Sequence, residues 1–213
     1  MSGITDFAQN KLKDALYRGQ ALAAPATLYF GLITASRGER VNSTAYALND
    51  TLVVKIGTAY SFYKCTTAGT SNATLPAAYL AAQGEIITDG TAVMAEQTAA
   101  LGAGTYAEVT GGSYARVAVV ASLANFSGTQ GAGTTAVSSG ISGVTSNNGA
   151  ITFPAPTAQW HPTGGAIVGE VVFDAATAGN PWNWALFAAP KNVNNGDPAP
   201  SNAAGVWSDK LGD

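Results

Sequence analysis

Few side chains in this sequence could perform catalysis, and their spacing does not assemble a reaction centre. His161 is the only histidine, and because it precedes a proline we expect it in an extended turn. Glu170 and Asp174 could be an acid pair, but four residues of strand separate them by roughly 13 Å, against roughly 5–9.5 Å in glycosidases. No Gly-x-Ser-x-Gly motif occurs, and no Lys follows Gly128–Gly133 to hold a phosphate. The sequence predicts no catalytic residue and no enzyme.

Metal and cofactor sites are not indicated either. One cysteine and one histidine cannot supply the usual zinc ligands, and no Asp-x-Asp-x-Asp-Gly calcium loop occurs. Cys65 has no second cysteine for a disulfide, so we expect it to be a small buried apolar group. We therefore expect neither a metal nor a cofactor.

The charge balance excludes two classes of partner. The 213 residues carry 10 Lys and Arg against 13 Asp and Glu, a net charge of −3, and charged residues make up 11% where about 25% is usual. Nucleic-acid binding requires clustered basic residues, and none cluster here. No stretch offers the roughly 20 apolar residues of a membrane helix, and the opening residues lack a signal peptide's basic region and apolar core. We expect no nucleic-acid and no membrane partner.

The scarcity of charge is greatest between Val117 and Gly169, where no Asp, Glu, Lys or Arg occurs. Val117–Ala121 is apolar at successive positions, which predicts a strand buried on both faces. Gly128–Asn148 is rich in Gly, Ser and Thr and has no apolar period. A loop of this length is unusual in a compact domain, so it is either mobile or ordered by another chain. We favour burial against a partner subunit.

One helix and many short strands are expected to support these residues. Apolar residues recur at helical spacing over residues 3–18, with Ser2 as the N-cap and Gly19 closing the helix. The helix either docks on the chain's own core or packs on neighbouring subunits. Strands are expected at Thr27–Thr34, Thr51–Lys55, Ala59–Thr66, Glu85–Thr88, Thr91–Glu96, Tyr106–Thr110, Tyr114–Leu123, Ala150–Phe153, Ala166–Asp174, Trp184–Ala188 and Val206–Ser208.

The composition changes along the chain and indicates an insertion. Residues 39–99 contain the cysteine, several tyrosines and the hairpin signal Asp89-Gly90. Residues 100–213 are richer in Gly and Ser and begin with a linker-like stretch. We therefore predict a mostly β protein. A β-sandwich host, residues 1–38 and 100–213, has one N-terminal helix and carries an inserted small β domain, residues 39–99.

The host resembles a known family. Glu108-Val-Thr-Gly-Gly-Ser-Tyr-Ala-Arg-Val117 resembles a signature of small bacteriophage structural proteins described as tail fibre proteins. Within it, Tyr114 and Arg116 share a strand face, where the guanidinium could stack on a ring or form a bidentate pair with a carboxylate. The arginine either has a functional role or is structural and holds a turn in place. Further segments resemble the same family in order: Ala24–Tyr29, Thr145–Pro154, Phe173–Asn180 and Lys191–Asp197.

The predicted insert resembles a different module. Gly57–Ser71 is similar to a small β module of phage tail proteins that is distantly related to carbohydrate-binding modules. Asn72 and Met94 depart from that pattern, since a glycine and an aromatic residue are expected there. The resemblance implies glycan contacts through Tyr60 and Tyr63, while the missing aromatic residue favours a spacer or decorating role.

The resemblances imply a non-enzymatic virion protein of a tailed phage, made in the host cytoplasm and located in the tail or tail fibre. Its partners would be copies of itself and other virion proteins. The expected subunit contacts are Phe7, Leu12, Leu16, Trp182 and Trp184, because exposed aromatic residues anchor interfaces. A capsid decoration protein is the first alternative. A glycan-binding adhesin that attaches to the host cell surface is the second.

Overall fold

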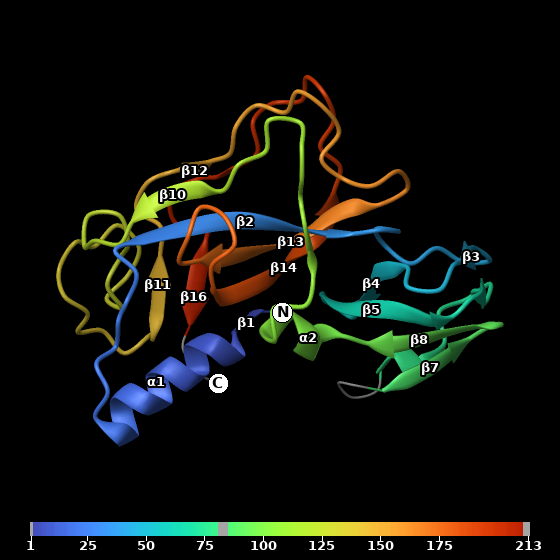
Figure 1. Cartoon of the computed structure of the whole chain (residues 1–213), viewed down its shortest axis with the longest axis horizontal. Coiled ribbons are helices and arrows are strands. Elements are labelled where there is room, and N and C mark those ends of the chain that lie inside the picture. The colour runs from blue at the N-terminus through green and yellow to red at the C-terminus, as the bar shows by residue number, and fades with distance from the viewer. Residues whose placement is uncertain (1, 81–84, 211–213) are drawn as a thin grey trace.

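The computed structural model describes residues 2–80 and 85–210, and it confirms a mostly β fold (Figure 1). The main sheet has the strand order β1-β14-β13-β2-β10, with β9 pairing on β2 beyond this path. All of its strand pairs are antiparallel. The strands are β1 (Ser2–Ile4), β2 (Thr27–Ala35), β9 (Ala107–Glu108), β10 (Val117–Val120), β13 (Ala166–Phe173) and β14 (Pro181–Lys191).

The central strand β13 is buried at all eight positions, because side chains cover both faces of the sheet. Successive residues point to opposite faces, so Val171 and Phe173 lie in one apolar cluster and Val172 in another. The first cluster also contains Ile33, Trp184 and Leu186. The second contains Phe30, Leu32, Phe153, Trp160 and Ile167. This two-sided burial accounts for the nearly continuous apolar run of β13.

A second sheet is formed by β4 (Thr51–Ile56), β5 (Ala59–Thr67), β8 (Ala92–Glu96) and β7 (Ile86–Asp89), in that order. Gly90 closes the predicted β7–β8 hairpin with φ of +70°, a value that favours glycine. This sheet has its own core, in which Cys65 is buried as expected. Beside it lie the two-stranded pair β3 (Ala45–Tyr46) and β6 (Gly69–Thr70) and the short 3₁₀ helix η1 (Ala77–Leu80).

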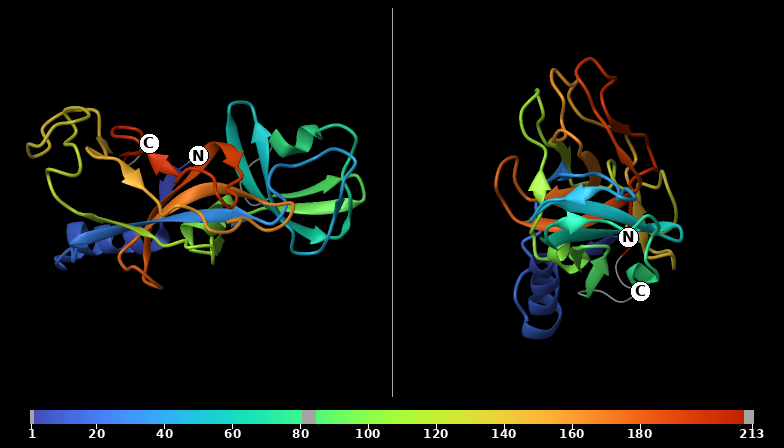
Figure 2. Two further views of the ribbon diagram at one scale, coloured as in Figure 1. Left: turned by 90° about the horizontal axis from the view of Figure 1, so that it is seen from above. Right: turned by 90° about the vertical axis from the view of Figure 1, so that its right-hand side faces the viewer.

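The two sheets lie side by side along the length of the molecule (Figure 2). Their contact is apolar: Val53, Tyr60 and Phe62 of the second sheet belong to the same cluster as Ile33 of the main sheet. Leu101 of the short helix α2 (Thr98–Gly102) completes that contact. The predicted insert, residues 39–99, thus shares one apolar cluster with the predicted host.

The helix α1 (Asp6–Arg18) begins later than predicted. Ser2 is not the N-cap, because Ser2–Ile4 instead forms β1 and pairs with β14. Thr5 caps the helix by accepting a hydrogen bond from the Ala8 amide, and Gly19 closes it in the left-handed conformation as expected. The helix then leads away from the main sheet (Figure 1). It is not long and apolar enough to span a membrane, and neither is any other helix of the described residues.

The prediction of a doubly buried strand at Val117–Ala121 is wrong. β10 covers Val117–Val120 and pairs only with β2, so it is an edge strand with one covered face. Its burial alternates, and the side chain of Val120 is 58% exposed. Small antiparallel pairs follow it in the chain, β11 (Val144–Ser146) with β16 (Ser208–Lys210) and β12 (Ile151–Thr152) with β15 (Ser201–Asn202).

The predicted loop Gly128–Asn148 includes β11, which pairs with β16, and is also held by hydrogen bonds within the segment. The Thr129 hydroxyl donates to the Gly140 carbonyl over 3.1 Å, and the Gln130 amide donates to the Val137 carbonyl over 2.6 Å. Asn148 joins the two ends of the loop by accepting from the Gly133 amide and donating to the Thr134 carbonyl.

Candidate functional site

Arg116 is the centre of a compact polar cluster at the signature motif. Its guanidinium binds both oxygens of Glu108, with Nε–Oε1 at 2.8 Å and Nη2–Oε2 at 2.7 Å. The remaining Nη1 donates to the carbonyls of Ala175 and Ala178 over 2.8 and 2.7 Å. Its face lies 3.2 Å from the centre of the Phe173 ring. The fork onto a carboxylate therefore occurs, and the guanidinium stacks on Phe173 rather than on the neighbouring Tyr114.

Tyr114 joins this cluster to the main sheet. Its hydroxyl donates to Glu108 Oε1 over 2.8 Å and accepts the Leu32 amide proton over 2.8 Å. Leu32 lies between the part of β2 that pairs with β10 and the part that pairs with β9, so the tyrosine occupies a gap in the strand ladder. Burial, and then the charge of Glu108, raises the pKa of Tyr114 above its usual value.

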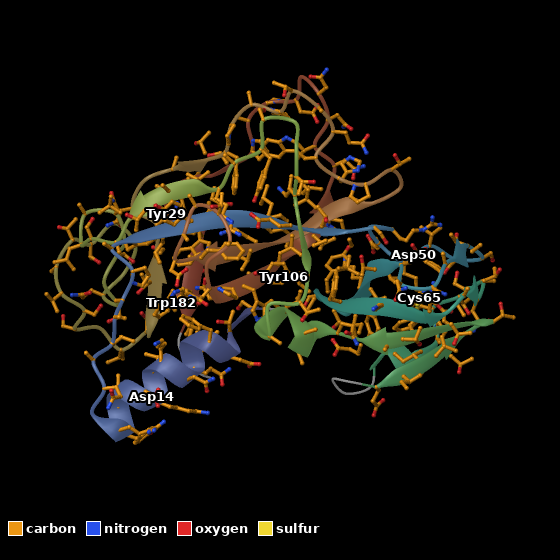
Figure 3. The ribbon with its side chains drawn as sticks, in the orientation of Figure 1. Asp14, Tyr29, Asp50, Cys65, Tyr106 and Trp182 are labelled. Carbon is orange, nitrogen blue, oxygen red and sulfur yellow. The ribbon has the colours of Figure 1, made fainter. Side chains whose placement is uncertain are left out.

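The cluster around Arg116 is tightly packed against the main sheet. Gly31 is required beneath it, because a Cβ there would lie 2.8 Å from Glu108 Oε1 and 3.0 Å from the Phe173 ring. Tyr106, which Figure 3 labels beside the main sheet, also packs on Phe173, with ring centres 6.3 Å apart. We call Glu108, Tyr114, Arg116 and Phe173 the Arg116 cluster and assign it a structural role.

The second sheet contains a similar arrangement that sequence reasoning missed. Arg40 binds Asp89 through both oxygens at 2.6 and 2.8 Å, and the Tyr79 hydroxyl donates to Asp89 over 2.9 Å. Burial raises the pKa of Asp89, but hydrogen bonds from Arg40, the Asn72 amide and Tyr79 outweigh it, so the net pKa is lowered. We call Arg40, Tyr79 and Asp89 the Arg40 cluster. The Asp89-Gly90 signal predicted the turn correctly and gave no hint of the ion pair.

The expected subunit contacts divide into buried and exposed groups. The rings of Phe7 and Trp182 meet edge to face, 5.6 Å apart, where α1 joins the main sheet (Figure 3). Trp184 is buried in the core and Leu12 is partly buried. Leu16 is 74% exposed. The structure therefore leaves Leu16 exposed, packs Phe7 on Trp182 where the helix joins the body, and uses Trp184 in the core.

The two tyrosines expected to contact glycans point into the core. Tyr60 and Tyr63 are 4% and 1% exposed. The Tyr60 hydroxyl donates to Glu39 over 2.9 Å, and Tyr63 packs edge to face on Tyr79. Burial raises the pKa of Tyr63 to about 12. Neither ring offers a face to a sugar in this structure.

Glu170 and Asp174, weighed above as an acid pair, have separate surroundings. Asp174 accepts hydrogen bonds from the backbone and side-chain amides of Asn180 in the turn after β13. Glu170 is buried in the middle of β13 and accepts from the Asn202 side chain over 2.8 Å. Glu170 also lines a cavity of about 560 Å³ under the C-terminal segment. In the described part of the chain, no group of three or more His, Cys, Asp or Glu side chains is placed to hold a metal ion.

Comparison with known proteins adds a family. Residues 91–206 match the family model described as podophage GP4 fiber I protein gp80. The chain belongs to this family of phage fibre proteins. A comparison with curated proteins finds no match. The matched segment contains the whole Arg116 cluster and the strands β13 and β14, whereas Ala24–Tyr29, one of the five resembling segments, lies outside it.

Proposed function

We propose that this protein is a non-enzymatic structural subunit of a phage tail fibre, and that it assembles with copies of itself through α1. Membership of the fibre family gives the structural role. The observation that supports the mode of assembly is the exposure of Leu16 and Tyr17, at 74% and 82%, on a helix that leads away from the main sheet. Exposed apolar groups gathered in this way are typical of interaction surfaces.

The attachment of the helix supports this role. Thr5 is fully buried, its amide donates to the Trp182 carbonyl over 3.0 Å, and Phe7 packs on the Trp182 ring. The first turn is therefore fixed to the body, while the last turn extends from it. This arrangement presents the exposed pair at a defined position, as a repeated contact between identical subunits requires.

The uncharged loop offers a second surface for the same purpose. Ile141 is fully exposed and Val137 is 73% exposed, on a loop whose shape is fixed by the internal hydrogen bonds described above. No charged residue between Val117 and Gly169 opposes its burial. A rigid, uncharged surface loses little conformational freedom or hydration when a neighbouring subunit covers it.

Light scattering on the purified full chain tests the assembly. The wild type is expected to form an oligomer, and Leu16→Glu or Tyr17→Glu to reduce its mass towards that of a monomer. Asn10→Glu, which adds the same charge at another exposed position of α1, is the matched control and should leave the mass unchanged. A monomeric wild type, or an oligomer that both variants leave intact, would contradict assembly through α1.

The location in the virion is tested separately. The protein should be found by mass spectrometry in purified particles, in a copy number that is a multiple of three or six. A labelled chain should then appear on the tail in electron micrographs. Hundreds of copies distributed over the head would instead indicate a capsid decoration protein.

A further inference from the structure

The main sheet ends at β10, and this edge lacks the usual protection against further pairing. β10 lies beside β2 at the margin of the sheet, and their ladder has no bulge (Figure 1). Exposed edge strands are normally protected by charged residues, prolines or bulges. Val117–Val120 contains neither a charged residue nor a proline, and no charged residue follows until Glu170. The edge is therefore open to pairing with another strand.

The backbone groups of β10 point alternately towards β2 and away from it. The Ala121 amide donates to the Ala26 carbonyl over 2.9 Å, which extends the ladder by one pair. Hydrogen-bonded pairs alternate along an antiparallel ladder, so Val119 also bonds to β2. It follows that Ala118 and Val120 direct their N–H and C=O groups away from the sheet.

Three of these four outward groups have no hydrogen-bond partner among the described residues. The Val120 carbonyl accepts from the Asn125 side chain over 2.9 Å. The Val120 N–H and both backbone groups of Ala118 form no hydrogen bond with the rest of the described chain. Ala118 is exposed and Val120 is 58% exposed, so water or another strand has access to them.

The surroundings of this edge fit a second copy of the same chain. Identical antiparallel strands related by a twofold axis place every donor of one copy opposite an acceptor of the other. The exposed side chains of Ala118 and Val120 are apolar and lie on one face of the strand. Arg116, immediately before β10, is paired with Glu108, and its side chain is only 7% exposed. Two copies thus meet here without like charges facing each other.

We propose that two copies of this chain pair antiparallel through β10, about a twofold axis at Ala118. The Ala118 N–H of each copy donates to the Ala118 carbonyl of the other. Two residues away, the Val120 N–H of each copy donates to the Arg116 carbonyl of the other, which has no hydrogen bond within the described chain. The two main sheets then continue into each other. This contact is separate from the one through α1.

Amide hydrogen exchange of the full chain, followed residue by residue by nuclear magnetic resonance, tests the pairing. In a single copy the Ala118 and Val120 N–H groups face water and exchange quickly, whereas the Val119 N–H is held by β2. Pairing should slow exchange at Ala118 and Val120 about tenfold between about 10 μM and about 1 mM protein. Exchange at Val119 should be slow at both concentrations.

A charge exchange at Ala118 tests the position of the axis. In the proposed pair the two Ala118 side chains are directly opposite, so Ala118→Lys brings two like charges together and should abolish the protection. Ala118→Glu should do the same, whereas an equal mixture of the two variants should restore it, which also shows that both variants fold. Ala59→Lys, at an exposed position of the second sheet, is the control and should pair as the wild type does.

The same measurement separates this contact from assembly through α1. Leu16→Glu should leave the protection at Ala118 and Val120 in place, because α1 takes no part in the edge. The proposal is overturned if both amides exchange quickly at every concentration, if their protection does not depend on concentration, or if the mixed variants do not restore it. Loss of the protection in Leu16→Glu would equally overturn it. Protection found only in purified particles would assign the edge to a different virion protein.

Discussion

The Glu108 carboxyl of the Arg116 cluster and the Glu170 carboxyl lie on opposite faces of the main sheet and are held in opposite ways. Gly31 and Phe173 mark the face with the Arg116 cluster, where Glu108 has an arginine fork and a tyrosine hydroxyl. Glu170 lies opposite Leu32 on the other face and has one amide. Both oxygens of the Glu108 carboxylate accept hydrogen bonds from Arg116. By contrast, Glu170 Oε1 is buried and has no hydrogen-bond partner among the described residues.

The Arg40 cluster extends the comparison to the second sheet. Its carboxylate and guanidinium are almost completely buried, at 0% and 4% exposure, against 22% and 7% for Glu108 and Arg116. In both clusters the guanidinium also donates to loop carbonyls: those of Asn72 and Thr74 in the Arg40 cluster, where Nη1 donates to the Asn42 side chain. Both arginines thus fix loops by the same chemistry, and the difference between them is burial.

The largest expected effect is the loss of Arg40. Arg40→Ala leaves Asp89 buried without its counter-charge and should lower the free energy of unfolding by about 3–5 kcal/mol. Arg116→Ala should cost less, on the order of 3 kcal/mol, because water reaches part of Glu108. Urea denaturation of both variants measures the difference. If Arg116→Ala were the more destabilising of the two, burial would not be what sets the strength of these clusters.

The Glu170 carboxyl has no counter-charge among the described residues, so it should stabilise the fold most when it is neutral. The pKa of Glu170 in the folded chain, about 7, lies above its ordinary value of 4.5, so folding favours the neutral acid. Its contribution is present in full below pH 4.5 and is lost as the pH rises through 7, by about 3 kcal/mol. Glu170→Gln should lack this loss. The measurement is the wild-type minus variant difference in unfolding free energy from pH 4 to 8; a flat difference would contradict the burial argument.

The sequence anticipated the Arg116 cluster better than the other two sites. Arg116 and Glu108 belong to one motif, so a fork between them could be expected from local spacing. Arg40 and Asp89 are separated by 49 residues, and nothing in either neighbourhood indicates the other. Burial of Glu170 depends on the C-terminal segment around Asn202 folding over β13, which is a tertiary effect that strand periodicity does not contain.

The same limit explains the errors in the fold. Ser2 has the chemistry of an N-cap, but pairing of Ser2–Ile4 with β14, far away in the chain, moves the cap to Thr5. Val117–Val120 has the composition of a central strand, yet β2 is its single neighbour in the main sheet. Local patterns correctly predicted the longer strands, including Ala59–Thr67 and Ala166–Phe173, but missed the short strands β1, β3, β6, β11 and β15. They did not predict which strand would lie at the edge.

A smaller effect is expected from crowding the Arg116 cluster without removing a charge. Gly31→Ala places a methyl group 2.8 Å from Glu108 Oε1 and 3.1 Å from the Tyr114 hydroxyl, so the ion pair must shift, at a cost of about 1–3 kcal/mol. Gly149→Ala, where a Cβ meets nothing within 4 Å, is the control and should be nearly neutral. Thermal denaturation of the two variants compares them. Equal stabilities would mean that the cluster tolerates displacement.

The smallest effect is expected from the exposed pair on α1. Arg18 binds Asp14 over 2.8 Å, as short as the Arg116 contacts, but the two side chains are 73% and 38% exposed. Water and salt screen such a pair, so Arg18→Ala should change the unfolding free energy by about 0.5 kcal/mol or less. Urea denaturation at low and high salt measures this, with Arg116→Ala as the buried counterpart. The Arg18 and Arg116 ion pairs have similar N–O distances but differ in burial. A loss of several kcal/mol for Arg18→Ala would therefore show that contact geometry, rather than burial, determines how much each arginine stabilises the fold.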